Sequence, residues 1–161
     1  MEKENKDRNQ VTELTHLGKI SQIETDPAKV VLDKIPNPNT DALYCCRFTA
    51  PEMSSLCPQT GQPDFATLII DYAPKDYLLE SKALKLYLFA FRQHGSFHED
   101  VTITIGRRIF DTINPYWLRI AGFWNGRGGI SIDIVWEAGI LPSGIKPLSI
   151  DNVKLYNNGH Y

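Results

Sequence analysis

WLRIAGFWNGRGGISIDIVW, residues 117–136, carries the clearest structural signal in the chain. Its two ends, 117–124 and 130–136, are rich in the β-branched and aromatic residues that favour strands. NGRGG at 125–129 separates them, and its glycines permit the positive φ angles of a tight turn. The segment therefore predicts an antiparallel β-hairpin that presents Arg127 at its turn.

Two helices are predicted on the N-terminal side of this hairpin. Residues 82–92 contain strong helix formers with no Gly or Pro, and Ser81 stands where an N-cap residue is expected. Within 98–113, apolar residues recur at every fourth position from Val101 to Ile113, which favours a helix, although alternation near its start also fits a strand. The first predicted helix has an apolar face. Its opposite face carries a basic stripe that consists of Lys82, Lys85 and Arg92.

Two more strands are predicted ahead of the helices, at residues 42–49 and 65–72, because both segments are rich in strand formers. The element order is then β-β-α-α-β-β, an α+β fold with an antiparallel four-stranded β-sheet and two helices packed on one face. Such a sheet leaves its other face and two strand edges bare, and small domains hide such edges by pairing with copies of themselves. We therefore expect a ring-like homo-oligomer whose sheets merge into a β-barrel, with ligand sites between subunits.

Length and composition indicate the domain organisation. A chain of 161 residues is long enough for one domain with a substantial core. Residues 1–40 are polar and interrupted by prolines, so we expect a flexible arm there with one short ordered piece around Val30 to Leu32. The domain itself is expected over 41–150 and a tail over 151–161. The net charge of -2 gives no field for gripping a phosphate backbone, so nucleic acid is not an expected partner. No apolar run approaches the ~20 residues of a membrane helix, so a membrane is not expected either.

Three cysteines restrict the chemistry further. Cys45 and Cys46 are adjacent, so together with Cys57 they form neither a disulfide framework nor the paired spacing of a structural zinc site. Neighbours on a strand also point to opposite faces, which disfavours a zinc-dependent cyclohydrolase. We expect reduced thiols, no metal and a cytoplasmic location.

Cys57 lies in SLCPQTGQPD, residues 55–64, together with Asp64. Two prolines and a glycine after the cysteine exclude a regular helix, so turns can present both side chains to a cleft. A free thiol has a pKa of about 8.5 and needs activation by its neighbours, and Asp64 is a candidate to take its proton. From the residues alone, Cys57 with His98 and Asp64 could equally form a thiol hydrolase that acts on an amide or a nitrile.

Four blocks of sequence resemble one family when taken in order: SLCP with GQPD at 55–58 and 61–64, ESKALK at 80–85, FHED at 97–100 and RGGIS at 127–131. They are similar to the NADPH-dependent 7-cyano-7-deazaguanine reductases, the nitrile reductases of queuosine biosynthesis. The chain resembles the single-domain, type I branch of that family, which implies the tunnelling fold. The resemblance also implies pentameric rings that pair as a decamer, with active sites between subunits.

The resemblance implies that the nitrile of 7-cyano-7-deazaguanine is reduced by two NADPH to the primary amine of 7-aminomethyl-7-deazaguanine. Cys57 is implied as the nucleophile that forms a covalent thioimide, and Asp64 as the general acid and base. Adding a thiolate to a poorly reactive nitrile gives a C=N group that accepts hydride readily. A non-catalytic purine-binding module is a second alternative, which a mass increment lost in Cys57→Ala would eliminate.

Ligand-binding residues are implied by the same resemblance. A carboxylate can accept the ring N–H and the amino group of a guanine-like base together, and this role is implied for Glu99, with His98 orienting the substrate or relaying a proton. Further substrate contacts are implied for Leu79, Glu80 and Ser81. NADPH contacts are implied for Lys82, Lys85 and Arg127. The chain has no Gly-x-Gly-x-x-Gly motif, so we do not expect NADPH in a Rossmann-type site.

Overall fold

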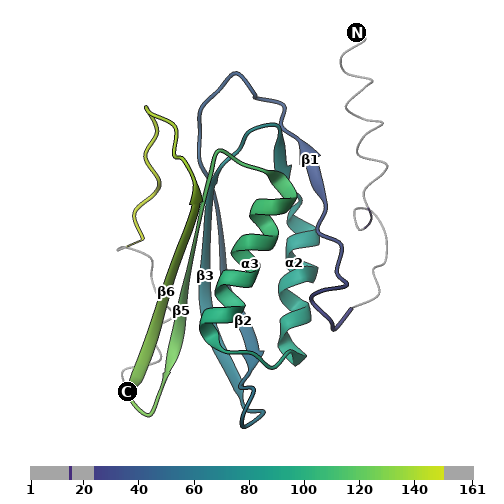
Figure 1. Ribbon diagram of the computed structural model, residues 1–161, viewed down its shortest axis with the longest axis vertical. Helices are drawn as coiled ribbons and strands as arrows, with labels where there is room; N and C mark the ends of the chain where they lie inside the picture. The colour runs from purple at the N-terminus through teal and green to yellow at the C-terminus, as the bar shows by residue number, and fades with distance from the viewer. Residues whose placement is uncertain (1–14, 16–23, 151–161) are drawn as a thin grey trace.

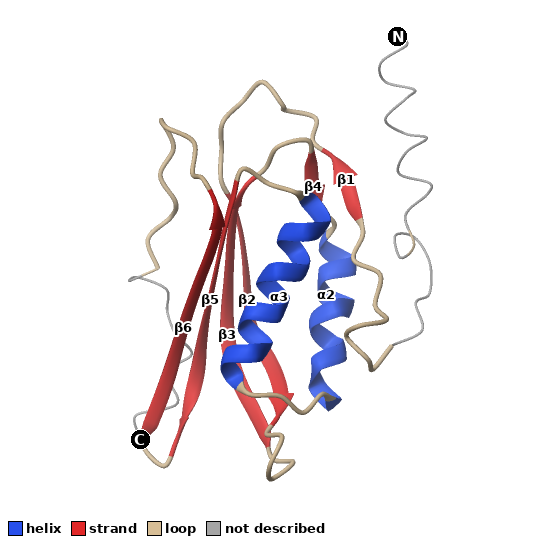
Figure 2. Cartoon of the chain, viewed as in Figure 1, coloured by secondary structure: helices blue, strands red, loops and turns tan. Residues whose placement is uncertain are grey.

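The structure is a computed structural model that describes residue 15 and residues 24–150. Its elements are β1 (Lys34–Pro36), β2 (Cys46–Leu56), β3 (Pro63–Ala73), β4 (Tyr77–Leu79), α2 (Ser81–Ala90), the short 3-10 helix η1 (Phe91–Gln93), α3 (His98–Ile113), β5 (Trp117–Arg127) and β6 (Ile130–Gly139). They form two layers, with α2 and α3 side by side on one face of a sheet (Figures 1 and 2). The apolar core lies between these layers.

The main sheet is antiparallel throughout and has the order β2-β3-β5-β6, while β1 and β4 form a separate two-stranded sheet. The predicted α+β class, the antiparallel pairing and the two helices are confirmed. The β1–β4 sheet was not predicted, because strands of three residues are too short to show an alternating pattern.

Strands β2 and β3 extend beyond the predicted segments 42–49 and 65–72. Pro51 lies inside β2, where its missing N–H would interrupt a central strand. It is tolerated because β2 is an edge strand and its pairing with β3 shifts between Ala50 and Met53, as in a β-bulge. The longer strand leads directly to Cys57.

Helix α2 begins one residue away from the predicted cap. The N-cap is Glu80, not Ser81: its carboxylate accepts hydrogen bonds from the backbone N–H of Lys82 at 2.9 Å and of Ala83 at 2.7 Å. A carboxylate has two acceptor oxygens and also carries the charge that a helix N-terminus favours. Ser81 is instead the first residue of the helix.

Helix α3 spans the predicted residues 98–113. The apolar residues at every fourth position, from Val101 to Ile113, are fully buried against the sheet. Asn114 then ends the helix in the left-handed conformation at φ 44°. The helical interpretation of this segment is therefore confirmed, and it places His98 at the first position of α3.

Part of the expected N-terminal arm packs against the domain. Val30 and Leu32 belong to the core, and β1 pairs with β4. This packing includes the short ordered piece expected around Val30 to Leu32 and continues to Pro36 in β1, since a few apolar side chains suffice to dock an otherwise polar segment. Residues 1–14 and 16–23 of the arm, and the expected tail at 151–161, lie outside the described residues.

Gly106 allows α3 to approach the sheet closely. A Cβ atom at this position would lie 2.7 Å from Cγ2 of Ile120 and 2.8 Å from Cε3 of Trp136. We expect Gly106→Ala to lower the free energy of unfolding by about 1–3 kcal/mol, the usual cost of overpacking a core. Chemical denaturation measures this change, with Arg107→Ala on the exposed face of α3 as a control within about 0.5 kcal/mol of wild type. Equal stability of Gly106→Ala and wild type would contradict the close packing.

Candidate active site

Three segments that are far apart in sequence meet at one end of the molecule. The turn between β2 and β3, the start of α3 and the turn between β5 and β6 all lie at the lower end of Figure 1. They carry Cys57 just after β2, Asp64 in β3, His98 in α3 and Arg127 at the end of β5. The contacts given below join these four side chains into one cluster.

The turn after β2 holds Cys57 through backbone hydrogen bonds. The Cys57 N–H donates to the carbonyl of Gln62 at 2.8 Å, and the Gly61 N–H donates to the carbonyl of Cys57 at 2.9 Å. Gly61 has a φ of 67°, a left-handed conformation that glycine adopts at little cost. On the other side, the Leu56 N–H donates to the carbonyl of His94 at 3.0 Å, so the loop before α3 also fixes the position of the thiol.

Hydrogen bonds to Cys57 favour its thiolate form. The Thr60 hydroxyl makes the largest contribution, followed by the Arg127 guanidinium and the backbone N–H groups of Thr60 and Gln59, and together they lower the pKa of Cys57 to about 6. An unperturbed thiol has a pKa of about 8.5, so Cys57 is mostly a thiolate at neutral pH. The activation that a nucleophilic cysteine needs is therefore present, and it comes from Thr60, Arg127 and Gln59 rather than from the Asp64 carboxylate.

Asp64 is buried in contact with two basic side chains. Its Oδ2 lies 2.8 Å from Nη2 of Arg127 and 3.0 Å from Nε2 of His98. Nη2 of Arg127 is also 3.2 Å from Nε2 of His98, and because a guanidinium only donates, this contact is a hydrogen bond only when Nε2 carries no proton. A protonated Nε2 donates to Asp64 instead. Asp64 and His98 can thus hold one exchangeable proton next to the thiolate.

Trp124 and Thr102 fix the His98 ring, and sequence reasoning missed both. The imidazole stacks on Trp124 with ring centroids 4.3 Å apart and an angle of 9° between the planes. The indole N–H of Trp124 donates to the Thr102 hydroxyl at 3.0 Å, and that hydroxyl donates to the backbone carbonyl of His98 at 2.8 Å. A tryptophan just before the NGRGG turn was visible in the sequence, but its partner depends on how α3 crosses β5.

The residues implied as further substrate contacts lie at the opposite end of the subunit from Cys57. Leu79 ends β4, and Glu80 and Ser81 open α2, at the end of the helices opposite the Cys57 turn (Figure 1). A ten-residue helix is about 15 Å long. Leu79 belongs to the core and Glu80 caps α2, while only Ser81 is exposed. One subunit therefore does not bring these residues to Cys57, and their substrate role stays a prediction.

Glu99 and His98 point in different directions, as neighbours on a helix must. His98 is buried in the cluster, whereas Glu99 is exposed and makes no hydrogen bond or ion pair with the residues that the structure describes. Its carboxylate is available to a ligand or to another chain. The role implied for Glu99 in binding the base also stays a prediction.

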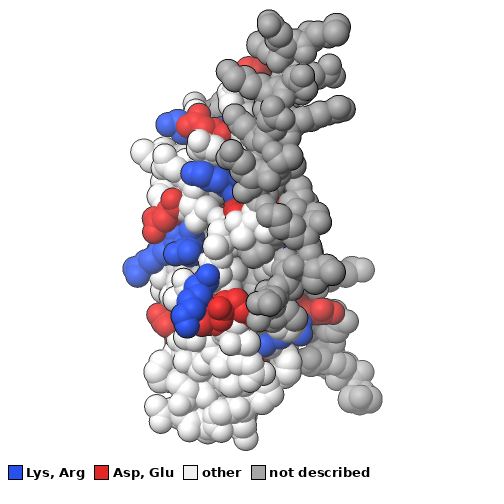
Figure 3. Space-filling model, turned by 90° about the vertical axis from the view of Figure 1, so that its right-hand side faces the viewer, with Lys and Arg blue, Asp and Glu red and all other residues white. Residues whose placement is uncertain are grey.

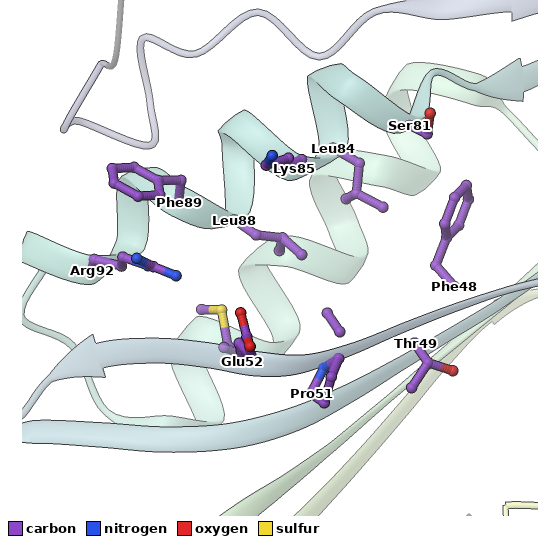
Figure 4. Close-up of a pocket in the computed structure, with 12 residues that line it drawn as sticks. Phe48, Thr49, Pro51, Glu52, Ser81, Leu84, Lys85, Leu88, Phe89 and Arg92 are labelled. Carbon is purple, nitrogen blue, oxygen red and sulfur yellow. The ribbon is translucent and has the colours of Figure 1, made fainter.

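A groove of about 330 Å³ runs between α2 and the edge strand β2. Leu84 and Leu88 point from the helix toward the strand, with Ser81 at one end of the groove and Arg92 at the other (Figure 4). Lys85 also lines it, so part of the predicted basic stripe borders an apolar wall. Cys57 does not line this groove.

Charge is mixed over the neighbouring surface. Where the described residues are visible in Figure 3, Lys and Arg side chains lie next to Asp and Glu side chains. Cationic side chains that contact a phosphate here would thus act locally.

Comparisons with known proteins place the chain in a family. The family model described as QueF-like protein matches residues 63–141. A curated NADPH-dependent 7-cyano-7-deazaguanine reductase of Caulobacter vibrioides (strain NA1000 / CB15N) is 55% identical over 132 residues, which are 82% of this chain and 87% of that protein. The chain belongs to this reductase family.

Further NADPH-dependent 7-cyano-7-deazaguanine reductases give the same result. The protein of Parvibaculum lavamentivorans is 54% identical over 135 residues, which are 84% of this chain and 88% of that protein. The protein of Brucella abortus (strain S19) is 56% identical over 129 residues, which are 80% and 83% of the two chains. A crystal structure of the archaeosine synthase QueF-Like in the apo form has a TM-score of 0.53 at 19% identity, over 62% of this chain and 96% of that chain, and supports the fold alone.

Three further findings concern metal binding, membrane spans and thiols in this reductase. Among residues 24–150, no group of three or more His, Cys, Asp and Glu side chains is arranged to hold a metal ion. Within the described residues, none of the helices has the length and apolar character that a membrane span requires. Cys45, Cys46 and Cys57 are all free thiols.

Proposed function

We propose that this chain reduces 7-cyano-7-deazaguanine to 7-aminomethyl-7-deazaguanine with two NADPH, in the cytoplasm, as a step of queuosine biosynthesis. The observation that carries the proposal is the Cys57 thiol, its pKa lowered to about 6, beside the buried Asp64–His98 pair that contacts the same Arg127 side chain. The relatives at 54–56% identity are named for this reaction, which supports the same substrate here. Free thiols suit a reducing compartment.

The first chemical step is covalent capture. Sγ of Cys57 attacks the nitrile carbon, a C–S bond forms, and one pair of C≡N π electrons moves to nitrogen. The nitrogen takes the proton held between Asp64 and His98, which lie 3.0 Å apart. The product is a thioimide, whose polarised C=N group accepts hydride more readily than the nitrile.

From the thioimide, reduction to the neutral amine needs two hydrides and one further proton. NADPH supplies the hydrides when it is bound. After the first reduction, Sγ of Cys57 departs as a thiolate, which its low pKa favours. The Asp64–His98 pair can supply that proton to nitrogen after the first hydride addition, and Trp124 keeps the imidazole in place throughout.

The substrate site is proposed to lie between two subunits. Glu99 and His98 from one copy would bind the guanine-like ring, and Leu79, Glu80 and Ser81 from a neighbour would complete the site. The separation of these two groups within one chain supports this arrangement (Figure 1). A carboxylate that accepts both the ring N–H and the exocyclic amino group would select guanine-like over adenine-like bases.

The same arrangement explains the two free sheet edges. Strands β2 and β6 are the outer strands of the main sheet, and β6 carries exposed apolar side chains. Unpaired edges of this kind are rarely left open in solution. We propose that β2 and β6 pair between copies, so that the sheets close into a barrel in pentameric rings, two of which form a decamer. A monomer with full activity in light scattering would contradict this assembly.

NADPH is proposed to bind along α2. The groove beside β2 offers an apolar wall and the cations Lys85 and Arg92, which fits a heterocycle that carries phosphates. Lys82 lies one helical turn before Lys85. Arg127 is proposed as a further NADPH contact, although its bond to Asp64 makes it a poor probe of NADPH binding alone.

We expect Lys82→Ala and Lys85→Ala each to raise KM for NADPH by about tenfold, the loss of one charge-assisted hydrogen bond. Covalent capture in the absence of NADPH should proceed at the wild-type rate, because neither lysine contacts the Cys57 cluster. Initial rates at varied NADPH measure the first effect and intact mass the second. Lys29→Ala is the control, since Lys29 is exposed and pairs only with Asp26 among the described residues. An unchanged KM for NADPH in both α2 variants would contradict the proposal that NADPH binds along α2.

One experiment separates the proposed reaction from its alternatives. The protein is mixed with 7-cyano-7-deazaguanine first without NADPH and then with it, and NADPH consumed per product is counted. Two NADPH per amine product support the reductase. A thiol hydrolase would form its product without consuming NADPH, and a purine-binding module would give neither adduct nor product.

A further inference from the structure

The hydroxyl of Ser55 is buried without a hydrogen-bond partner. Among the side chains that the structure describes, it is the one buried N or O atom in this condition, and Ser55 is 0% exposed. Burying a hydroxyl without a partner is unfavourable, and such groups are rare in folded proteins. A buried hydroxyl without a partner, next to reactive groups, therefore indicates that a bound ligand supplies its hydrogen-bond partner.

Strand geometry places this hydroxyl beside the nucleophile and the carboxylate. Ser55 and Cys57 are two positions apart and both buried, so their side chains share one face of the sheet. The Cys57 N–H bonds to the Gln62 carbonyl, which continues the strand pairing beyond Leu56. Ser55 is also the direct cross-strand partner of Asp64, and the Cβ atoms of such pairs lie about 4.5–5.5 Å apart.

We propose that the Ser55 hydroxyl donates a hydrogen bond to the nitrile nitrogen of the substrate while Cys57 adds to the adjacent carbon. The inference rests on the covalent capture proposed above. In that step the C–S bond forms, one π pair moves to nitrogen, and the proton from the Asp64–His98 pair neutralises it. Ser55 keeps its own proton and only stabilises the developing negative charge.

The chemistry of capture explains why a neutral donor suits this position. Negative charge appears on the nitrogen before protonation is complete, and a fixed donor in a dry site stabilises such charge without reorganising. Asp64 already directs Oδ2 to Arg127 and His98, so a separate donor is needed for the nitrogen at the start of the step. Ser55 is held in the β2–β3 ladder and is ready for this role.

We expect Ser55→Ala to slow formation of the adduct roughly 100-fold, as when one donor to a developing anion is removed. Intact mass at timed intervals, without NADPH, measures the rate. The Kd for 7-deazaguanine, which has the same ring without the nitrile, should change less than about twofold, because the Ser55 hydroxyl bonds only to the nitrile nitrogen. The melting temperature should not fall, because the deleted hydroxyl has no partner in the fold.

Ser54→Ala is the matched control. Ser54 pairs with Phe65 and its side chain points to the opposite face of β2, so its rate, affinity and melting temperature should equal those of wild type. Adduct formation by Ser55→Ala at the wild-type rate would overturn the proposal. Equal losses of 7-deazaguanine affinity and adduct rate, or a lower melting temperature, would also overturn it, since they indicate a structural role. Absence of an adduct in the wild-type protein would instead contradict covalent capture itself.

Discussion

Cys57→Ala should abolish NADPH oxidation in the presence of 7-cyano-7-deazaguanine while the protein stays folded. Without the thiolate the nitrile is not converted into a group that accepts hydride, and removal of a catalytic nucleophile lowers rates by a factor on the order of 10⁶. The variant should also lose the mass increment that wild type gains without NADPH. NADPH absorbance and intact mass measure these two effects. A melting temperature near that of wild type would show that the loss is chemical.

Cys45→Ala is the control for this experiment. Burial raises the pKa of the Cys45 thiol, so this residue stays protonated at neutral pH and is a poor nucleophile. Its replacement should leave both the adduct and NADPH oxidation unchanged. Residual NADPH oxidation by Cys57→Ala at even a hundredth of the wild-type rate would contradict the assigned nucleophile, because alanine offers no route to a thioimide.

The rate of adduct formation should rise with pH and level off above about pH 6. The thiolate is the reactive form, and the pKa of Cys57 is lowered to about 6, so the reactive fraction falls about tenfold per pH unit below that value. The thiolate is also the form that the folded state favours. Its contribution to stability is complete above the unfolded pKa of about 8.5 and is lost as the pH falls through about 6.

Removing the groups that bind the thiolate should shift this pH profile upward. Thr60→Ala deletes the largest contribution and should move the midpoint from about 6 toward the ordinary value of about 8.5. With a full shift, the rate at pH 6 would fall by a factor on the order of 100, and the rates of the two proteins would converge at high pH. Timed intact-mass measurements across the pH range give both midpoints.

Thr104→Ala is the control for this shift, because Thr104 is exposed on α3 and its hydroxyl contacts Asp100. Its pH profile should match that of wild type. A wild-type midpoint near 8.5, or an unshifted midpoint in Thr60→Ala, would show that the turn after β2 does not activate the thiol.

The fold was predictable where the signal is local. Apolar spacing within 98–113 gave the bounds of α3, and the glycines near Arg127 gave the β5–β6 hairpin. The lengths of β2 and β3 were not predictable in this way, because Pro51 is tolerated only at an edge strand with a bulge. The docking of residues 30–36 depends on a tertiary contact with β4 that no sequence period reveals.

The site was predictable as a set of residues but not as a geometry. The four blocks of sequence pointed to Cys57, Asp64, His98 and Arg127, and the structure brings these together. They did not show that Arg127 contacts the nucleophile and its neighbouring carboxylate, because that contact depends on where the β5–β6 turn ends. The stacking of Trp124 on His98 and the buried, unpartnered hydroxyl of Ser55 could not be predicted from the sequence either. Both arise only when α3 packs on the sheet.

The most direct test of covalent capture follows the nitrile carbon itself. 7-Cyano-7-deazaguanine labelled with ¹³C at the nitrile is added to the protein without NADPH, and the carbon is observed by NMR while the adduct is mapped by peptide mass. The proposal predicts that the nitrile resonance is replaced by one typical of a C=N carbon bonded to sulfur, and that the added mass lies on the peptide that contains Cys57. A nitrile resonance that persists in the bound state, with no mass added at Cys57, would contradict it.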